Sequence, residues 1–407
     1  MIRKLLGTQT ESRDISYQDI FKRGLDDIQG RTAAGEQVSY DTSLTVSAVY
    51  GAIRLISDTI STLNFSTYEN RNGIETPYNP IPEWLREMNP ELTNSELLGS
   101  ALVSLLLDGN IYLATLRDGR GQVLSLNVLD PTDITPKMVR FEDGTQQLKF
   151  DSSKNPEYTY TTRDIQMIRG MLKPSQIEGV SPIKAAREVI GSSIAINRYQ
   201  GTFFGNGAIP GSIITVPNQL SPEAAKNMKE AFNETHRGAG NGHRLAVLTE
   251  GASWQRIALA GEDAQWLEAQ RATVSDICRI YGLPPFLLAD NEGSTQWGSG
   301  LHELNVGFVT YSMRPVVARL EDGLTKIMRS TGIGNAYLKF DLASMTRGTN
   351  ERWETYKTAL QNGIVNIDEV RAWEGLAPLP DGEGQKHYVP LNMAEVGAET
   401  DDDEVQE

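Results

Sequence analysis

The feature that most constrains this chain is a pair of long helical segments separated by a compact insert. The first segment begins at Ser181 and is expected to run to about Phe204. Serine is a favoured N-cap, and Pro182 suits the first helical turn, where its missing N–H would have had no partner. The second segment runs from Asp263 to Tyr281, with apolar residues at spacings of three and four. Periodicity alone also fits two core helices of an ordinary domain, but the order helix, insert, helix is unusual.

The insert between the two helices carries strand and helix signals of its own. The stretch GSIITVP indicates a strand, and Ser221 followed by Pro222 marks the start of a helix. A glycine-rich turn follows at 238–242, and the stretches RLAVLTE and SWQRIAL predict two more strands. A small α/β module is therefore expected to interrupt the helical pair.

Beyond the second helix, a cluster of glycine and proline at 282–285 stops the helical pattern, and a loop rich in Gly, Ser and Asn follows. A third long helix is expected from Leu301, and Pro315 predicts a kink along it. One strand is predicted over 336–341, and two further helices within 349–375.

The first half of the chain has the pattern of an α+β domain. Apolar residues at spacings of three and four predict an amphipathic helix over 46–63. A second helix is expected over 94–109, followed by a β-hairpin over 111–130 and by antiparallel strands as far as Ile168. Residues 40–175 are therefore expected to form one α+β domain.

Composition and charge narrow the classes of function. Hydrophobic residues make up 39% of the 407, enough to fill a core. No apolar run approaches the roughly 20 residues of a membrane span, so a soluble protein without a membrane partner is expected. The single cysteine, Cys278, is read as a small buried hydrophobe, not as a nucleophile. The net charge of −15 argues against tight, sequence-reading binding of nucleic acid, but it permits DNA to pass without sticking.

Motifs that would carry chemistry are missing from the sequence. No Gly-Lys-Ser/Thr follows a glycine at P-loop spacing, which disfavours an ATPase. The run Gly179-Val180-Ser181 continues without the second glycine of a nucleophile elbow. His236 and His243 flank the glycine-rich turn, but without a cysteine cluster or paired carboxylates a metal site is disfavoured. The sequence therefore predicts neither an enzyme nor a cofactor.

Taken in order, these segments resemble the portal proteins of tailed double-stranded DNA bacteriophages, of the lambdoid, long-tailed-phage type. The resemblance covers about residues 40 to 330 without a break in order. The loop DNEGSTQWGSG and the acidic C-terminal tail depart from the pattern of that family, which leaves their roles open. The stretches that carry the resemblance are VSAVYGAIRLISDTISTLNFSTYE, LLLDGNIYLATLRDGRGQVLSLNVLDP, GVSPIKAAREVIG, FFGNGAIPGSIITVP, RLAVLTEGASWQRI, DAQWLEAQRATVSDICRIYGLPPFLL and MRPVVARLEDGL.

The resemblance implies a dodecameric ring around a central channel and an α+β portal fold. In that fold a small α/β clip is inserted between two stem helices, and the wing, the tunnel loop and the helical crown complete the subunit. The implied parts are an N-terminal arm (1–40), wing (41–180), first stem helix (181–205), clip (206–262), second stem helix (263–282), tunnel loop (283–300), tunnel helix and wing return (301–347), crown (348–392) and acidic tail (393–407).

The resemblance also suggests candidate site residues, none of them catalytic and none a metal ligand. Polar tunnel-loop residues would face the moving DNA: Asn291, Ser294, Gln296 and Trp297. Trp297 fits packing between neighbouring subunits equally well. Basic stem residues would either line the bore or form surface or inter-subunit ion pairs: Lys184, Arg187, Arg198, Arg271 and Arg279. Clip residues would help to dock the motor or the adaptor: Arg237, Asn241 and His243.

The implied function is the channel at one capsid vertex, through which double-stranded DNA is packaged and ejected. The implied partners are further copies of the chain, the terminase large subunit, the major capsid or scaffold protein, a head–tail adaptor and double-stranded DNA that passes non-specifically. Twelve copies at −15 would sum to −180, which would repel phosphate and let DNA slide. The protein would be assembled in the host cytoplasm and reside in the virion. The alternatives are a packaging enzyme, either motor or nuclease, and a virion adaptor or baseplate component of smaller stoichiometry.

Overall fold

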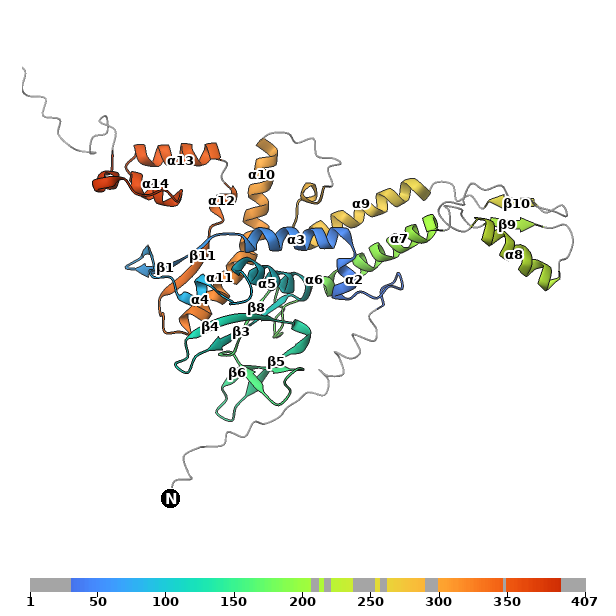
Figure 1. The fold of residues 1–407 in the computed structure, drawn as a ribbon, viewed down its shortest axis with the longest axis horizontal. Coiled ribbons are helices and arrows are strands. Elements are labelled where there is room, and N and C mark those ends of the chain that lie inside the picture. The colour runs from blue at the N-terminus through green and yellow to red at the C-terminus, as the bar shows by residue number, and fades with distance from the viewer. Residues whose placement is uncertain are drawn as a thin grey trace, which may run out of the picture. The chain divides into compact units, whose positions relative to one another are not determined.

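The structure is a computed structural model of the chain (Figure 1). It describes residues 31–205, 212–215, 221–236, 253–256, 262–289, 299–346 and 349–388. The chain divides into two compact units, residues 1–341 and 342–407, and each is described by itself. The predicted acidic tail at 393–407 lies outside the described residues.

Two packed helices form the centre of the first unit. These are α3 (Ser47–Ser61) and α5 (Asn94–Asp108), with the short α2 (Tyr40–Leu44) and α4 (Glu83–Arg86) beside them in the sequence. Thr93 caps α5 in a reciprocal box with Glu96, and Gly109 ends it at a φ of 85°. Both helices bury a stripe at helical spacing, made of Val49, Ala52, Ile53, Ile56 and Ile60 on α3 and of Leu97, Leu98, Ala101, Leu102 and Leu105 on α5.

The first unit also contains three small antiparallel sheets built from β1–β8 and β11. The first has the order β11 (Ala336–Phe340), β1 (Phe65–Arg71), β2 (Ile74–Pro77). The second has the order β4 (Val123–Leu129), β3 (Asn110–Arg117), β8 (Ile165–Arg169). The third has the order β5 (Ile134–Arg140), β6 (Gln146–Ser152), β7 (Thr159–Thr161), and the 3-10 turn η1 (Pro131–Asp133) leads into it.

The second and third sheets share one cluster of buried side chains. Tyr112 of β3 and Phe150 of β6 meet edge to face, with ring centroids 6.1 Å apart, and both are fully buried. Ile134, Ile165 and Met167 complete the cluster. The α+β character expected for this part of the chain is therefore confirmed.

The first predicted stem helix is two helices. α6 (Pro182–Ala185) begins where Ser181 and Pro182 predict, but it ends at Ala186, and α7 (Arg187–Gly205) follows. Ser181 Oγ accepts the Lys184 N–H and donates to the Leu107 carbonyl, 2.7 Å away. This contact with the end of α5 ties α6 to the core, and no glycine or proline in the sequence marks the break.

The second predicted stem helix corresponds to α9 (Glu262–Tyr281), which packs along α7 (Figure 1). Between them in the sequence lie β9 (Ser212–Thr215), α8 (Pro222–His236) and β10 (Ser253–Arg256). β9 and β10 pair antiparallel, with Ser212 opposite Arg256. Ser221 caps α8 as predicted, while the predicted strand RLAVLTE lies outside the described residues.

The third helix is interrupted, although not in the manner predicted. α10 (Ser299–Phe308) leads into a π turn, η3 (Val309–Met313), and then into α11 (Arg314–Arg329). The Arg314 N–H bonds to the Val309 carbonyl, five residues back. The sequence predicts a kink at Pro315, but the wide turn comes just before it, because Pro315 has no N–H to continue the regular ladder.

The second unit is helical. It contains α12 (Ala343–Thr346), α13 (Thr349–Gln361), α14 (Ile367–Trp373) and the turn η4 (Pro380–Gln385). Asn366 caps α14 in a reciprocal box with Glu369, and α13 and α14 both lie within the range 349–375 predicted for two helices. The Tyr356 ring meets Trp353 edge to face and Trp373 at a tilt, with both centroid distances 5.7 Å, and the contact with Trp373 joins α13 to α14.

Candidate functional site

The five basic residues predicted for the stem all lie exposed on described helices. Lys184 belongs to α6, Arg187 and Arg198 to α7, and Arg271 and Arg279 to α9. Arg187 and Arg198 are eleven residues apart, three helical turns, and so share one face of α7.

Residues 31–37 of the same chain cover that face of α7. Glu36 forms an ion pair with Arg198, with Glu36 Oε1 2.6 Å from Arg198 Nη1. The Ala33 N–H donates a hydrogen bond to Glu188 Oε2 at 2.9 Å. Thr32 sits so closely over Gly191 that a Cβ added there would collide with it. The sequence does not predict a fixed position for this segment, because no local pattern in it indicates a partner so far along the chain.

Two other arginines predicted for the stem also form ion pairs with acids of the same chain. Arg187 lies 3.6 Å from Glu188, and Arg279 pairs with Asp276 one turn earlier on α9. Exposed pairs of this kind stabilise a fold by about 0–1 kcal/mol. A single chain therefore already supplies acidic partners for at least three of the five bases predicted for the stem, and the exposure of these bases to a bore stays a prediction.

The other predicted site residues lie outside the described residues. They are the tunnel-loop residues Asn291, Ser294, Gln296 and Trp297, and the clip residues Arg237, Asn241 and His243.

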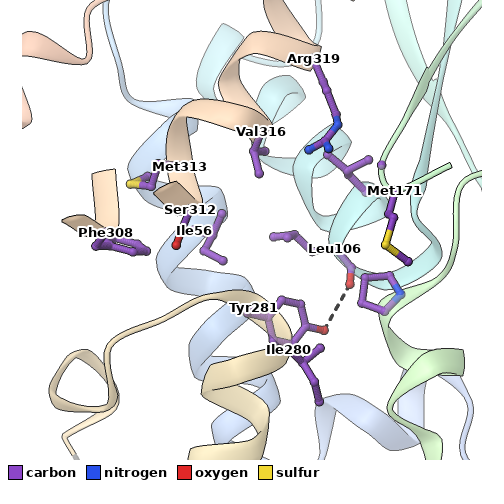
Figure 2. Close-up of a pocket in the computed structure, with 13 residues that line it drawn as sticks. Ile56, Leu106, Met171, Ile280, Tyr281, Phe308, Ser312, Met313, Val316 and Arg319 are labelled. Atoms are coloured by element: carbon purple, nitrogen blue, oxygen red, sulfur yellow. Dashed lines mark hydrogen bonds between the residues drawn. The ribbon is translucent and has the colours of Figure 1, made fainter. Parts of the chain in front are cut away.

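A cleft that the sequence does not predict lies where α9, α10 and α11 meet the core (Figure 2). Its volume is about 180 Å³. Its lining comes from the core helices, from the segment after β8, from the end of α9 and from both sides of η3. The lining residues are Ile56, Leu105, Leu106, Gly170, Met171, Pro182, Ile280, Tyr281, Phe308, Ser312, Met313, Val316 and Arg319.

Two hydrogen bonds hold the end of α9 at this cleft. The Tyr281 hydroxyl donates to the Leu106 carbonyl of α5 at 3.2 Å, drawn as a dashed line in Figure 2. Burial raises the pKa of Tyr281, so the hydroxyl keeps its proton. The Ser312 hydroxyl of η3 donates to the Gly282 carbonyl at 2.5 Å. The end of α9 is therefore tied both to the core and to the π turn.

The described residues show neither a metal cluster nor a helix suited to a bilayer. No group of three or more His, Cys, Asp and Glu side chains among them is placed to hold a metal ion. Of the helices in the described ranges, none combines the length and the apolar character that a membrane crossing requires. Cys278 is 2% exposed on α9, which confirms its expected burial.

Comparison with known proteins gives one consistent result. The family model described as "Phage portal protein" matches residues 47–375. The probable portal protein of Streptomyces phage phiC31 is 41% identical over 379 residues, 90% of this chain and 82% of that protein. The portal protein of Enterobacteria phage HK97 is 27% identical over 360 residues, 86% of this chain and 83% of that protein.

A solved structure shows the same fold. A chain from the neck of a native gene transfer agent particle, computed with C12 symmetry, matches with a TM-score of 0.58 at 21% sequence identity. The match covers 86% of this chain and 100% of that chain.

Proposed function

The chain belongs to the phage portal protein family, and on that premise we propose that twelve copies close into a ring around a DNA channel. Members of this family form the channel at a capsid vertex through which the double-stranded genome is packaged and ejected. Identical copies joined head to tail close into a ring when their rotation returns to the first copy. The C12 symmetry used for a structure of the same fold supports the number twelve.

The observation that carries the proposal is the helical pair with a module inserted in it. α7 and α9 pack along each other, and β9, α8 and β10 lie between them in the sequence. In a ring, twelve such pairs would form the stem around the bore, and twelve inserted modules would form the clip. The predicted tunnel loop at 283–300 follows α9 directly and would face the DNA.

Charge supports a channel that DNA passes without being held. The chain carries −15, and at least three of the five bases predicted for the stem pair with acids of the same chain. Each base that neutralises a phosphate strengthens DNA binding and makes it more dependent on salt, with a slope of about −0.9 per phosphate. Bases already paired with carboxylates bind phosphate less, so we expect weak, non-specific contact with the duplex.

We propose the finer partners from the family. The clip would dock the terminase large subunit during packaging and a head–tail adaptor afterwards, and the wing would meet the major capsid or scaffold protein. Assembly would take place in the host cytoplasm before the ring enters the virion. The chain would act as a conduit without catalysis, so purified protein is expected to hydrolyse no nucleotide, and hydrolysis above background would favour a packaging enzyme instead.

The decisive experiment is electron microscopy of the purified full chain viewed end-on, together with native mass measurement. We expect a ring of twelve subunits with a hole wide enough for a DNA duplex. A monomer at high protein concentration would contradict the proposal, and a closed assembly of fewer subunits would favour an adaptor or baseplate component.

A further inference from the structure

The cleft at η3 has an apolar interior. Ile56, Leu105 and Leu106 form its floor, and each is at most 6% exposed. Phe308 and Met313 close one side and are 8% and 0% exposed. An apolar cavity of about 150 Å³ is known to hold benzene, so about 180 Å³ has room for an apolar body of that size.

Three of the thirteen lining residues have polar side chains, and two of these already donate their protons. The Tyr281 hydroxyl donates to the Leu106 carbonyl, and the Ser312 hydroxyl donates to the Gly282 carbonyl. The third is Arg319, whose side chain reaches from α11 toward the cleft in Figure 2.

Arg319 supplies the only charge among the lining residues, because no acid belongs to that set. Among the residues that the structure describes, its guanidinium makes one hydrogen bond, from Nη1 to the Pro315 carbonyl of its own helix at 3.3 Å. A guanidinium carries five N–H donors and binds a carboxylate through two of them at once. An apolar cleft with one convergent cation at its rim has the chemistry of a site for an apolar anion.

We propose that this cleft binds a small apolar carboxylate. A ring or branched chain about the size of benzene would lie among Ile56, Leu106 and Phe308, and the carboxylate would face Arg319. The ligand would touch η3 through Met313 and the end of α9 through Ile280. Its occupancy would therefore hold the π turn against α9, whatever partners the ring engages.

The test uses the assembled full-chain protein and two matched probes, 3-phenylpropionate and the neutral 3-phenylpropanol, in isothermal titration calorimetry at neutral pH. We expect wild-type protein to bind the acid about tenfold more tightly than the alcohol, because a hydrogen bond to a charged group is worth more than a neutral one. Arg319→Gln should remove that difference, while Arg314→Gln, an exposed arginine on the same helix outside the cleft, should preserve it.

A second variant tests the apolar part of the site. Val316→Trp fills the cleft and should abolish binding of both probes. If that variant does not assemble, Val316→Met replaces it and should weaken both probes by the same factor. Failure of the wild-type protein to bind the acid, or equal acid binding by wild type and Arg319→Gln, would overturn the proposal. So would unchanged binding by the assembled Val316 variant.

Hydrogen exchange gives an independent measurement of the position. At saturating 3-phenylpropionate, the amides of residues 309–314 are expected to exchange more slowly, since the ligand packs against η3. Amides of β5–β7, which are remote from the cleft in the fold, serve as the internal control. Binding that leaves exchange at 309–314 unchanged would place the ligand elsewhere and refute the assignment.

Discussion

Two side chains of α11 cap the outer edge of β11. The Phe340 N–H donates to a carboxylate oxygen of Glu321 at 2.7 Å, and the Leu338 N–H donates to Thr325 Oγ1 at 3.1 Å. β11 is an edge strand of its sheet, so these N–H groups would otherwise be available to another chain. The two caps close this edge and keep β11 on α11.

Glu321 should make stability fall as pH rises. Burial raises the pKa of Glu321 above its usual 4.5, and the Phe340 N–H and the Lys339 charge oppose that shift only in part. The folded state thus holds the proton more tightly than the unfolded state. The contribution of Glu321 to the free energy of unfolding is fully present below about pH 4.5. It is lost as pH rises through the pKa that Glu321 has in the folded state. Glu321→Gln keeps an acceptor without the charge and should raise the melting temperature at pH 7.

Thermal denaturation from about pH 4 to pH 8 checks this prediction. The Gln variant should show a flatter pH dependence than the wild type over the acid half of that range. Glu303→Gln, at an exposed acid of α10 that is not among the charges acting on Glu321, is the matched control and should leave the slope unchanged. If melting temperature depends on pH in the same way in the wild type and in Glu321→Gln, Glu321 is not the source of the pH dependence.

Two glycines of α7 should respond to alanine in opposite directions. A Cβ at Gly191 meets Thr32, whereas a Cβ at Gly201 has nothing within 4 Å. Gly191→Ala should therefore displace residues 31–37 and destabilise the fold by about 1–3 kcal/mol. Gly201→Ala should stabilise it by about 0.5–1 kcal/mol, because alanine is the better helix former. Chemical denaturation measures both changes, and equal effects would contradict the close contact at Gly191.

At the scale of elements, the sequence predicts most boundaries that have a local chemical cause. Thr93, Ser181 and Asn366 cap helices by hydrogen bonding to their own first turns, and Gly109 ends α5 in a left-handed conformation. The break at Ala186 has no such local signal. The short helix before it is tied to α5 by the hydrogen bond from Ser181 to Leu107, 74 residues earlier, and a single sequence does not reveal that contact.

The π turn illustrates the same limit, and one hydrogen bond in it can be tested. Ser312→Ala removes the bond to Gly282, whose net worth is about 0.5–1.5 kcal/mol. Amides of residues 309–314 should then exchange about twofold to tenfold faster. Tyr311→Phe, a change at the neighbouring and 81% exposed residue, should leave exchange unaltered. Equal exchange in wild type and Ser312→Ala would show that the bond does not hold η3.

At the scale of the whole molecule, family and fold are predictable from sequence because a series of segments in a fixed order is itself a specific pattern. The cleft is not predictable in this way. Its lining residues are spread from Ile56 to Arg319, and no short motif contains more than a few of them. The covering of α7 by residues 31–37 escapes prediction for the same reason.

The tunnel-loop prediction belongs to the assembled ring. Deleting residues 291–297 should leave assembly intact, because the helices and sheets described above do not include them. It should impair DNA packaging or retention, since the loop is expected to touch the duplex in the bore. The test is the amount of DNA packaged per capsid. It is compared with that of a wild-type control of matched ring yield. Heads filled to the normal level by the deletion variant would make the assignment wrong.

The pairing of β1 with β11 has a consequence for synthesis of the protein. Phe65 faces Phe340, 275 positions later in the chain. At roughly 5–20 residues per second, a ribosome needs about 14–55 seconds to cover that distance. Throughout this interval β1 has β2 as its neighbour, and a two-stranded hairpin is marginally stable in water. A nascent chain paused before Ala336 would thus present the open edge of β1, a surface that a chaperone could protect until β11 is made.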